Sequence, residues 1–79
     1  MDLAQAIRIR INNLIAERNL TVSKLSFLAG ISRATLSKFL AGKRNFLRID
    51  IIEFICEALD IKLKDFFNDP IFENIDIKE

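Results

Sequence analysis

The chain of 79 residues contains no histidine and only one cysteine, Cys56. The absence of histidine removes the commonest general base and metal ligand, and a single cysteine excludes an internal disulfide and a cysteine-based zinc site. The sequence also has no glycine-rich phosphate loop and no cluster of metal ligands. We therefore expect no enzyme, no catalytic residues, no metal and no cofactor, and we expect Cys56, on an apolar stripe, to be a core residue.

Long apolar runs are missing as well. No run approaches the roughly 18 residues that a membrane span needs, and the N-terminal Met1-Asp2-Leu3 lacks the basic and then apolar layout of a signal peptide. The sequence therefore predicts a cytoplasmic protein without a membrane partner. Its length suits one domain, and its 51% hydrophobic content is enough for a packed core.

Glycine occurs only at Gly30 and Gly42, and each lies where a helix is expected to end. The residues between them form one short helix that Ser32 can cap, and residues 21–29 form another, capped by Thr21. Gly30 can adopt the left-handed conformation that joins two helices in a tight turn. This segment predicts a helix-turn-helix, the unit that places its second helix in the DNA major groove.

Apolar spacing places the other elements. It predicts a first helix over residues 3–18, a fourth over about 49–59 and a last short helix near 61–67. Residues 71–77 alternate weakly and fit a short strand or a loose tail. We expect a helix-turn-helix domain over residues 1–69 and a C-terminal tail over 70–79. The expected core stripe of the fourth helix is Ile49, Ile52, Ile55, Cys56 and Leu59.

The net charge of +1 conceals a strong asymmetry. Residues 1–48 carry nine basic and two acidic side chains, whereas residues 49–79 carry three basic and nine acidic ones. A chain divided in this way can turn a basic face toward a polyanion and an acidic face away from it.

The basic and small residues of the third helix predict how it reads DNA. Residues that contact bases must be short or able to donate to base edges, whereas phosphate contacts set register and affinity. The predicted base contacts are Arg33, Ala34, Ser37 and Lys38. The predicted phosphate contacts are Thr21, Ser23, Lys24, Ser32, Thr35, Lys43, Arg44 and Asn45.

The order and spacing of these motifs resemble a known family. The segment from Leu20 to Phe39 resembles the helix-turn-helix of the phage repressor/Cro class, also called Xre-like, and the match extends over about residues 7–67. The resemblance implies an all-α, compact five-helix, lambda-repressor-like DNA-binding domain that binds a near-palindromic operator as a homodimer. The chain departs from the family pattern at Val22, where glutamine is common, and at Leu47 and Arg48, where proline and a Ser/Thr cap are common.

Helix four is apolar on a second stripe beside its expected core stripe, so something must cover it. The C-terminal segment, a second copy of the chain and a different protein are the three candidates. The predicted dimer surface is Ile51, Phe54, Ala58, Ile71, Phe72 and Ile75.

Two functions follow from these observations. The first is a sequence-specific transcriptional regulator, a repressor, with double-stranded DNA as its partner. The second is a protein-interaction module of the same fold, such as an antitoxin or a regulator of another regulator, which the apolar patch and the acidic second half favour.

Overall fold

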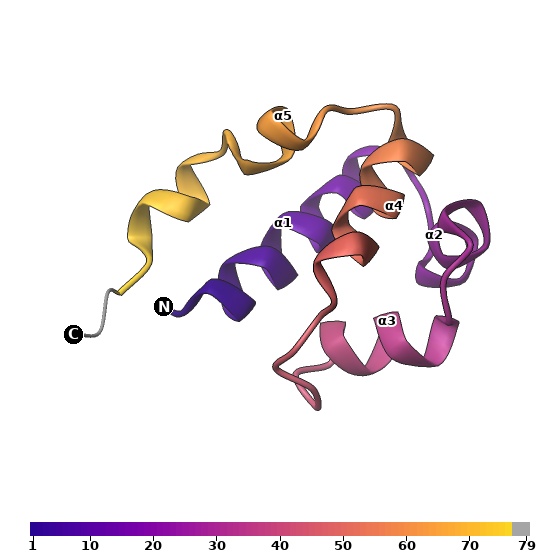
Figure 1. The fold of residues 1–79 in the computed structure, drawn as a ribbon, viewed down its shortest axis with the longest axis horizontal. Coiled ribbons are helices and arrows are strands. Elements are labelled where there is room, and N and C mark those ends of the chain that lie inside the picture. The colour runs from indigo at the N-terminus through magenta and orange to yellow at the C-terminus, as the bar shows by residue number, and fades with distance from the viewer. Residues whose placement is uncertain (77–79) are drawn as a thin grey trace.

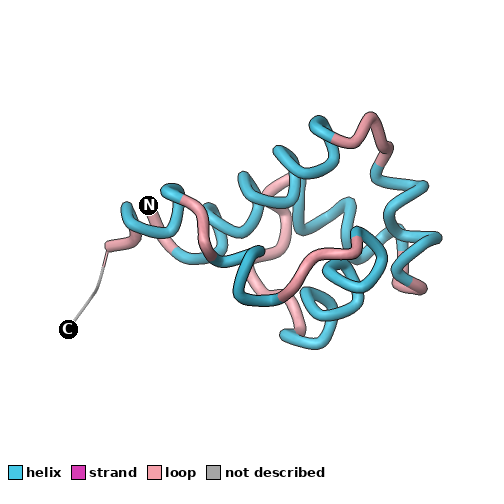
Figure 2. The backbone as a smooth tube through the Cα atoms, turned by 90° about the horizontal axis from the view of Figure 1, so that it is seen from above, coloured by secondary structure: helices cyan, strands magenta, loops and turns pink. Residues whose placement is uncertain are grey.

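The structure is a computed structural model that describes residues 1–76. Its helices surround one core, as Figure 1 shows, and no strand occurs among the residues described (Figure 2). The expected all-α, five-helix fold is thereby confirmed. The helices are α1 (Leu3–Glu17), α2 (Val22–Ala29), α3 (Arg33–Leu40), α4 (Ile49–Leu59), α5 (Leu63–Phe67) and the 3-10 helix η1 (Pro70–Asn74).

Side-chain caps start the first three helices. Asp2 accepts the Gln5 N–H at 2.8 Å while the Gln5 side chain accepts the Asp2 N–H at 2.9 Å, which forms a capping box at the start of α1. Thr21 and Ser32 cap α2 and α3, as the sequence predicts. Helix α4 has Arg48 at its N-cap and no side-chain cap bond, in agreement with the missing Ser or Thr.

Four helices end in the same way, with one residue in the left-handed conformation. Asn19, Gly30, Gly42 and Asp60 have φ values of 53°, 68°, 79° and 55° and follow α1, α2, α3 and α4 respectively. In each case the next residue donates its N–H back across the last turn, for example Ile31 to the Ser26 carbonyl at 3.0 Å. This is the Schellman motif, which satisfies carbonyl groups that the helix itself leaves without partners.

The core lies between α1, α2, α4 and α5, and α3 closes it from one side. Helix α4 packs against α2 as well as α5, so apolar residues on two of its faces are covered within one chain. The buried core residues are Ala6, Ile7, Ile11, Leu14, Leu25, Leu36, Phe39, Ile51, Ile52, Ile55, Cys56, Leu59 and Phe66.

The prediction for helix α4 was wrong at two residues. Ile49, expected in the core, is 84% exposed, and Ile51, expected on the second stripe, is 8% exposed. Ile51 and Phe54 face a groove whose other wall includes Gly30 and Ile31. Helix α2 packs against α4 and buries Ile51, while Phe54 and Ala58, the other residues of the second stripe, are half-buried.

The expected strand or loose tail is also corrected. Residues 70–74 form η1, which packs against α1, and the Phe72 ring lies 5.1 Å from that of Phe67 and 6.2 Å from that of Phe66. The Asp76 N–H donates to the Met1 carbonyl at 2.9 Å. Residues 70–76 thus continue the packed unit, while residues 77–79 lie outside the described part of the chain.

Replacement of Gly30 by alanine tests the turn. An added Cβ would meet no atom within 4 Å, so the cost comes from the left-handed backbone, which disfavours a side chain by about 1 to 2 kcal/mol. We expect Gly30→Ala to lower the urea midpoint at constant m-value, and Asp60→Gly to raise it. A lower urea midpoint in both variants would show that left-handed strain does not govern the stability of these turns.

Cys56 tests the core assignment. Burial raises the pKa of its thiol, with Arg10 opposing that shift, and the side chain is nearly inaccessible. We expect iodoacetamide at pH 8 to alkylate the native protein at least about a hundredfold more slowly than the urea-unfolded protein. Equal rates would contradict the burial.

Candidate nucleic-acid interface

Helix α3 has two chemically different faces. Leu36 and Phe39 are buried in the core and fix the helix on the body of the protein. The other face carries no large apolar side chain and has both charge and small residues. Every predicted base-contact residue lies on this exposed face, namely Arg33, Ala34, Ser37 and Lys38.

The turn between α2 and α3 sets the angle of this face. The Gly30 N–H donates to the Phe27 carbonyl at 3.2 Å, which closes the end of α2. Ser26 is 3% exposed and its hydroxyl donates to the Val22 carbonyl at 2.8 Å, so its only polar side-chain group is satisfied inside the helix pair. Ile31 packs against the core beyond the turn. Together these contacts hold α3 across α2 as a rigid helix-turn-helix.

Each of the two capping hydroxyls accepts a backbone hydrogen bond at a helix start. Thr21 Oγ1 accepts the Lys24 N–H at 3.0 Å, and Ser32 Oγ accepts the Thr35 N–H at 3.3 Å. A hydroxyl that accepts one bond can still donate another. Ser23 and Lys24 are exposed beside Thr21, whereas Val22 is half-buried against the core and offers no polar side chain.

The loop after α3 brings basic residues beside this surface. Lys43, Arg44 and Asn45 are all exposed. A groove runs between the start of α3 and this loop, and Ser32, Thr35 and Arg44 line it. Ser32 and Thr35 of α3 and Arg44 of the loop therefore share one depression, whereas the predicted contacts Lys43 and Asn45 do not line it.

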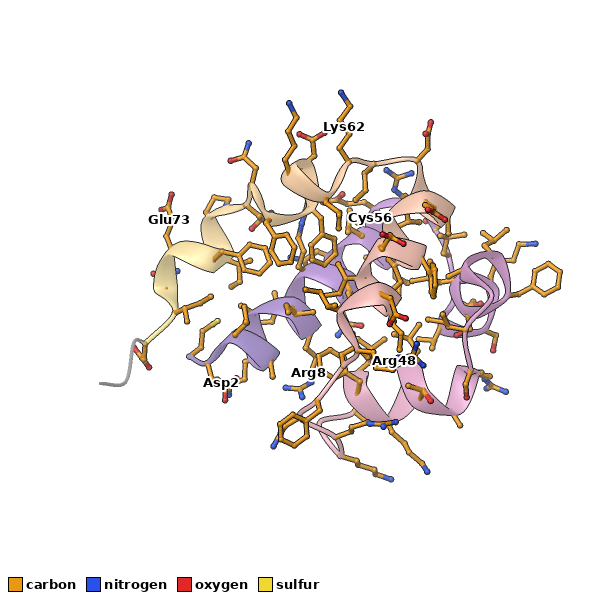
Figure 3. All side chains as sticks on the ribbon, viewed as in Figure 1. Asp2, Arg8, Arg48, Cys56, Lys62 and Glu73 are labelled. Atoms are coloured by element: carbon orange, nitrogen blue, oxygen red, sulfur yellow. The ribbon has the colours of Figure 1, made fainter. Side chains whose placement is uncertain are left out.

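Arg48 lines the same groove and was missed by sequence reasoning. Its side chain is exposed and pairs with Asp50 in the first turn of α4. Figure 3 shows Arg48 beside the segment that joins α3 to α4, with Lys62 on the opposite side of the molecule from α3. Sequence reasoning counted Arg48 among the nine basic residues of residues 1–48 and noted it as a departure from a capping residue, but did not name it as a phosphate contact.

Two arginines counted with the basic half are engaged by backbone carbonyls. Arg8 donates to the Phe39 carbonyl at the end of α3, and Arg10 donates to the Phe66 carbonyl at the end of α5. Both come from α1 and both guanidinium groups lie over the ring of the residue that they bind. The exposed basic side chains around α3 are therefore those of α2, of α3 itself and of the following loop.

The residues predicted for the dimer surface lie in different environments. Ile51 is buried, and Phe72 packs against the core together with Ala58. Phe54, Ile71 and Ile75 are half-buried. A separate apolar surface, defined by Ile49, Leu63 and Phe67 and hereafter called the α4–α5 face, is more exposed.

Two negative findings concern residues 1–76. They contain no group of three or more His, Cys, Asp or Glu side chains placed to hold a metal ion. Within the same residues, no helix has the length and apolar character required to cross a membrane.

Comparison with known proteins agrees with this geometry. Residues 10–70 match the Cro/C1-type HTH DNA-binding domain family. Over 60 residues the chain is 38% identical to YozG of Bacillus subtilis (strain 168), an uncharacterized HTH-type transcriptional regulator. That alignment covers 76% of this chain and 71% of the relative. No solved structure gives a significant match.

The matched region includes α2, α3, α4 and α5 entire, together with the basic loop. The family consists of DNA-binding regulators, which confirms the expectation that the chain is not an enzyme. The helix-turn-helix geometry and this match lead to one conclusion: the chain belongs to the Cro/C1-type HTH family and is a DNA-binding transcriptional regulator.

Proposed function

We propose that the protein is a sequence-specific repressor that binds a near-palindromic operator as a homodimer. The observation that carries this proposal is the exposed face of α3, where Arg33, Ser37 and Lys38 lie together while Leu36 and Phe39 anchor the opposite face. Arg33 can pair bidentately with guanine, and Ala34 leaves room for close approach to a thymine methyl.

In this mechanism, each copy inserts α3 in the major groove, and the two copies lie about one helical turn apart. The hydroxyls of Thr21 and Ser32 and the loop residues Lys43 and Arg44 hold the phosphates on either side. A dimer seated across a promoter excludes the polymerase. We place this activity in the cytoplasm.

We assign the dimer contact to the α4–α5 face. Ile49 protrudes from the start of α4, and a groove beside it is lined by Leu63 and Phe67. In a two-fold dimer each contact occurs twice, so Ile49 of each copy would enter the groove of the other. This assignment replaces Ile51 and Phe72 of the predicted dimer surface, because their own chain already packs against them.

Charge supports the same pairing. Glu53 lies beside the apolar residues on α4, as does Asp50, which also pairs with Arg48 of its own chain, and Lys62 and Lys64 lie at the start of α5. A two-fold axis that sets α4 against the partner's α5 brings acidic side chains near basic ones, which favours the correct register.

A second candidate is a protein-interaction module. Phe27 is 77% exposed and Leu28 is also exposed on α2, and the Lys24 ammonium lies 5.5 Å from the Phe27 ring centroid. Neither apolar side chain is needed for DNA contact or for the α4–α5 face. The double change Arg33→Ala/Lys38→Ala separates the candidates, since it should abolish DNA binding and leave a protein partner bound.

Selection of bound duplexes from a random DNA pool tests the main proposal. We expect an inverted repeat with half-sites about one turn apart. Neutralisation of about 4 to 6 phosphates per copy predicts a slope near −4 to −5 per protomer in log affinity against log salt. Unselective retention, or a flat salt response, would contradict sequence-specific recognition.

Substitution of Arg33 and substitution of Lys43 should weaken DNA binding in different ways. Arg33→Ala removes a base contact, so we expect a loss of about 1 to 3 kcal/mol and relaxed preference at one base position. Lys43→Ala removes a phosphate contact, so affinity should fall equally on all sequences and the salt slope should shrink by about 1. Titration of both variants against the selected operator and its single-base variants measures both effects. Identical profiles for the two variants would refute the division of roles.

The α4–α5 face is tested by Ile49→Lys. Because Ile49 is largely exposed, the change should leave the fold intact but place a charge in the apolar contact. We expect light scattering to give half the wild-type mass. Phe27→Lys, at an equally exposed position on α2, is the matched control and should stay dimeric. A dimeric Ile49→Lys variant would rule out this surface.

A further inference from the structure

Arg8 connects three parts of the protein through one side chain. From α1, its Nε donates to the Phe39 carbonyl at 2.6 Å, and its Nη2 donates to the Arg44 carbonyl at 3.3 Å. The guanidinium carbon lies 4.9 Å from the centroid of the Phe39 ring. Phe39 belongs to the last turn of α3 and Arg44 to the loop that follows. Figure 3 shows Arg8 between α1 and this loop.

The chemistry of this contact suits an arginine. Carbonyl groups at the end of a helix carry partial negative charge, and a cation is favourable there. The Phe39 carbonyl already accepts the Gly42 N–H at 3.1 Å, and its second lone pair remains for Arg8. A planar guanidinium can reach two carbonyls and stack on a ring at once, whereas an ammonium group cannot.

The bonds to Phe39 and Arg44 fix the loop on the recognition helix. The hydrogen bond from Arg8 Nη2 to the Arg44 carbonyl ties the loop to α1, and replacement of Arg8 would remove it. Lys43 and Arg44 point their charges outward from a segment that contains Gly42 and has no secondary structure of its own. The Lys43 N–H also donates to the Lys38 carbonyl at 3.0 Å, so this tie acts together with the turn at Gly42 to set where those charges lie relative to Arg33 and Lys38.

We propose that Arg8 is a positioning residue for DNA binding, which sets the distance between the phosphate-contacting loop and the reading face of α3 without touching DNA itself. The inference rests on the proposed contacts of Lys43 and Arg44 with phosphates. It assigns a DNA-binding role to a side chain whose hydrogen-bonding groups face the protein.

Arg10 provides a matched comparison within the same helix. Its Nε donates to the Phe66 carbonyl at 2.8 Å and its Nη2 to the Asp65 carbonyl at 3.0 Å, and its Nη1 lies 3.2 Å from a carboxylate oxygen of Asp69. Its guanidinium lies over the Phe66 ring, as that of Arg8 lies over Phe39. The two arginines make the same kind of contact, but Arg10 closes the end of α5 and has no link to α3.

The experiment compares Arg8→Met, Arg8→Lys and Arg10→Met by titration of the selected operator and a scrambled duplex of equal length, at a temperature where circular dichroism shows every variant folded. We expect Arg8→Met to weaken binding to both duplexes about tenfold. Arg8→Lys keeps the charge and should recover little of that loss. Arg10→Met should bind within about twofold of wild type although its stability also falls.

A double-mutant cycle shows whether Arg8 acts through the loop. In a Lys43→Ala/Arg44→Ala background the loop charges are gone, so Arg8→Met should cost no more than about twofold. An unchanged tenfold cost in that background would overturn the inference, because Arg8 would then contact a phosphate itself. Full rescue by Arg8→Lys would overturn it as well, because charge alone would suffice.

A measurement without DNA separates this inference from the proposed function. We expect backbone order parameters of residues 43–45 to fall from near 0.85 to below about 0.6 in Arg8→Met and to stay unchanged in Arg10→Met. Unchanged order parameters of residues 43–45 in Arg8→Met would show that Arg8 does not hold the loop in place. Failure of the wild-type protein to bind either duplex, with the order parameters behaving as expected, would refute the DNA proposal and leave the tie established.

Discussion

An eight-residue helix is too short to be stable in water, since isolated helices below about 12 to 15 residues are marginal. Helix α3 therefore depends on the burial of Leu36 and Phe39. The Ser32 cap starts it, and Arg8 with the Gly42 turn satisfies its end. The core between α1, α2 and α4 supplies the surface on which those two side chains rest. DNA recognition by this fold is thus a consequence of core packing and helix capping acting on the same short segment.

Local rules were enough to predict the helix-turn-helix. The capping hydroxyls of Thr21 and Ser32 act within three residues, and the left-handed turn at Gly30 needs only its own backbone, so each could be derived from the sequence. The sequence could not show that Ile51 is buried and Ile49 exposed. Both residues suit an apolar helix, and only the packing of α2 against α4 decides which of them is covered. Residues 70–74 were misjudged for the same reason, since an aromatic contact with α5 fixes them.

Arg8 and Arg10 were beyond sequence reasoning for a different cause. Each binds a carbonyl 31 or 56 residues away, and carbonyl groups carry no signature in a sequence. The charge count assigned both arginines to the DNA-facing half, whereas in the structure their guanidinium groups donate to carbonyl groups at helix ends. The basic character of the interface accordingly rests on fewer side chains than the count suggested, and the structure places one of the counted residues, Arg48, in the lining of the α3 groove.

The separation of the two faces of α3 bears on how such a regulator can diversify. Arg33, Ala34, Ser37 and Lys38 are exposed, and none belongs to the buried set that holds the helix. Exposed substitutions away from caps and cores usually alter stability by no more than about 0.5 kcal/mol. On the proposed assignment of these four side chains to base contacts, duplicated copies of the gene could acquire new target sequences by substitution at four codons while the scaffold stays under its own, independent selection.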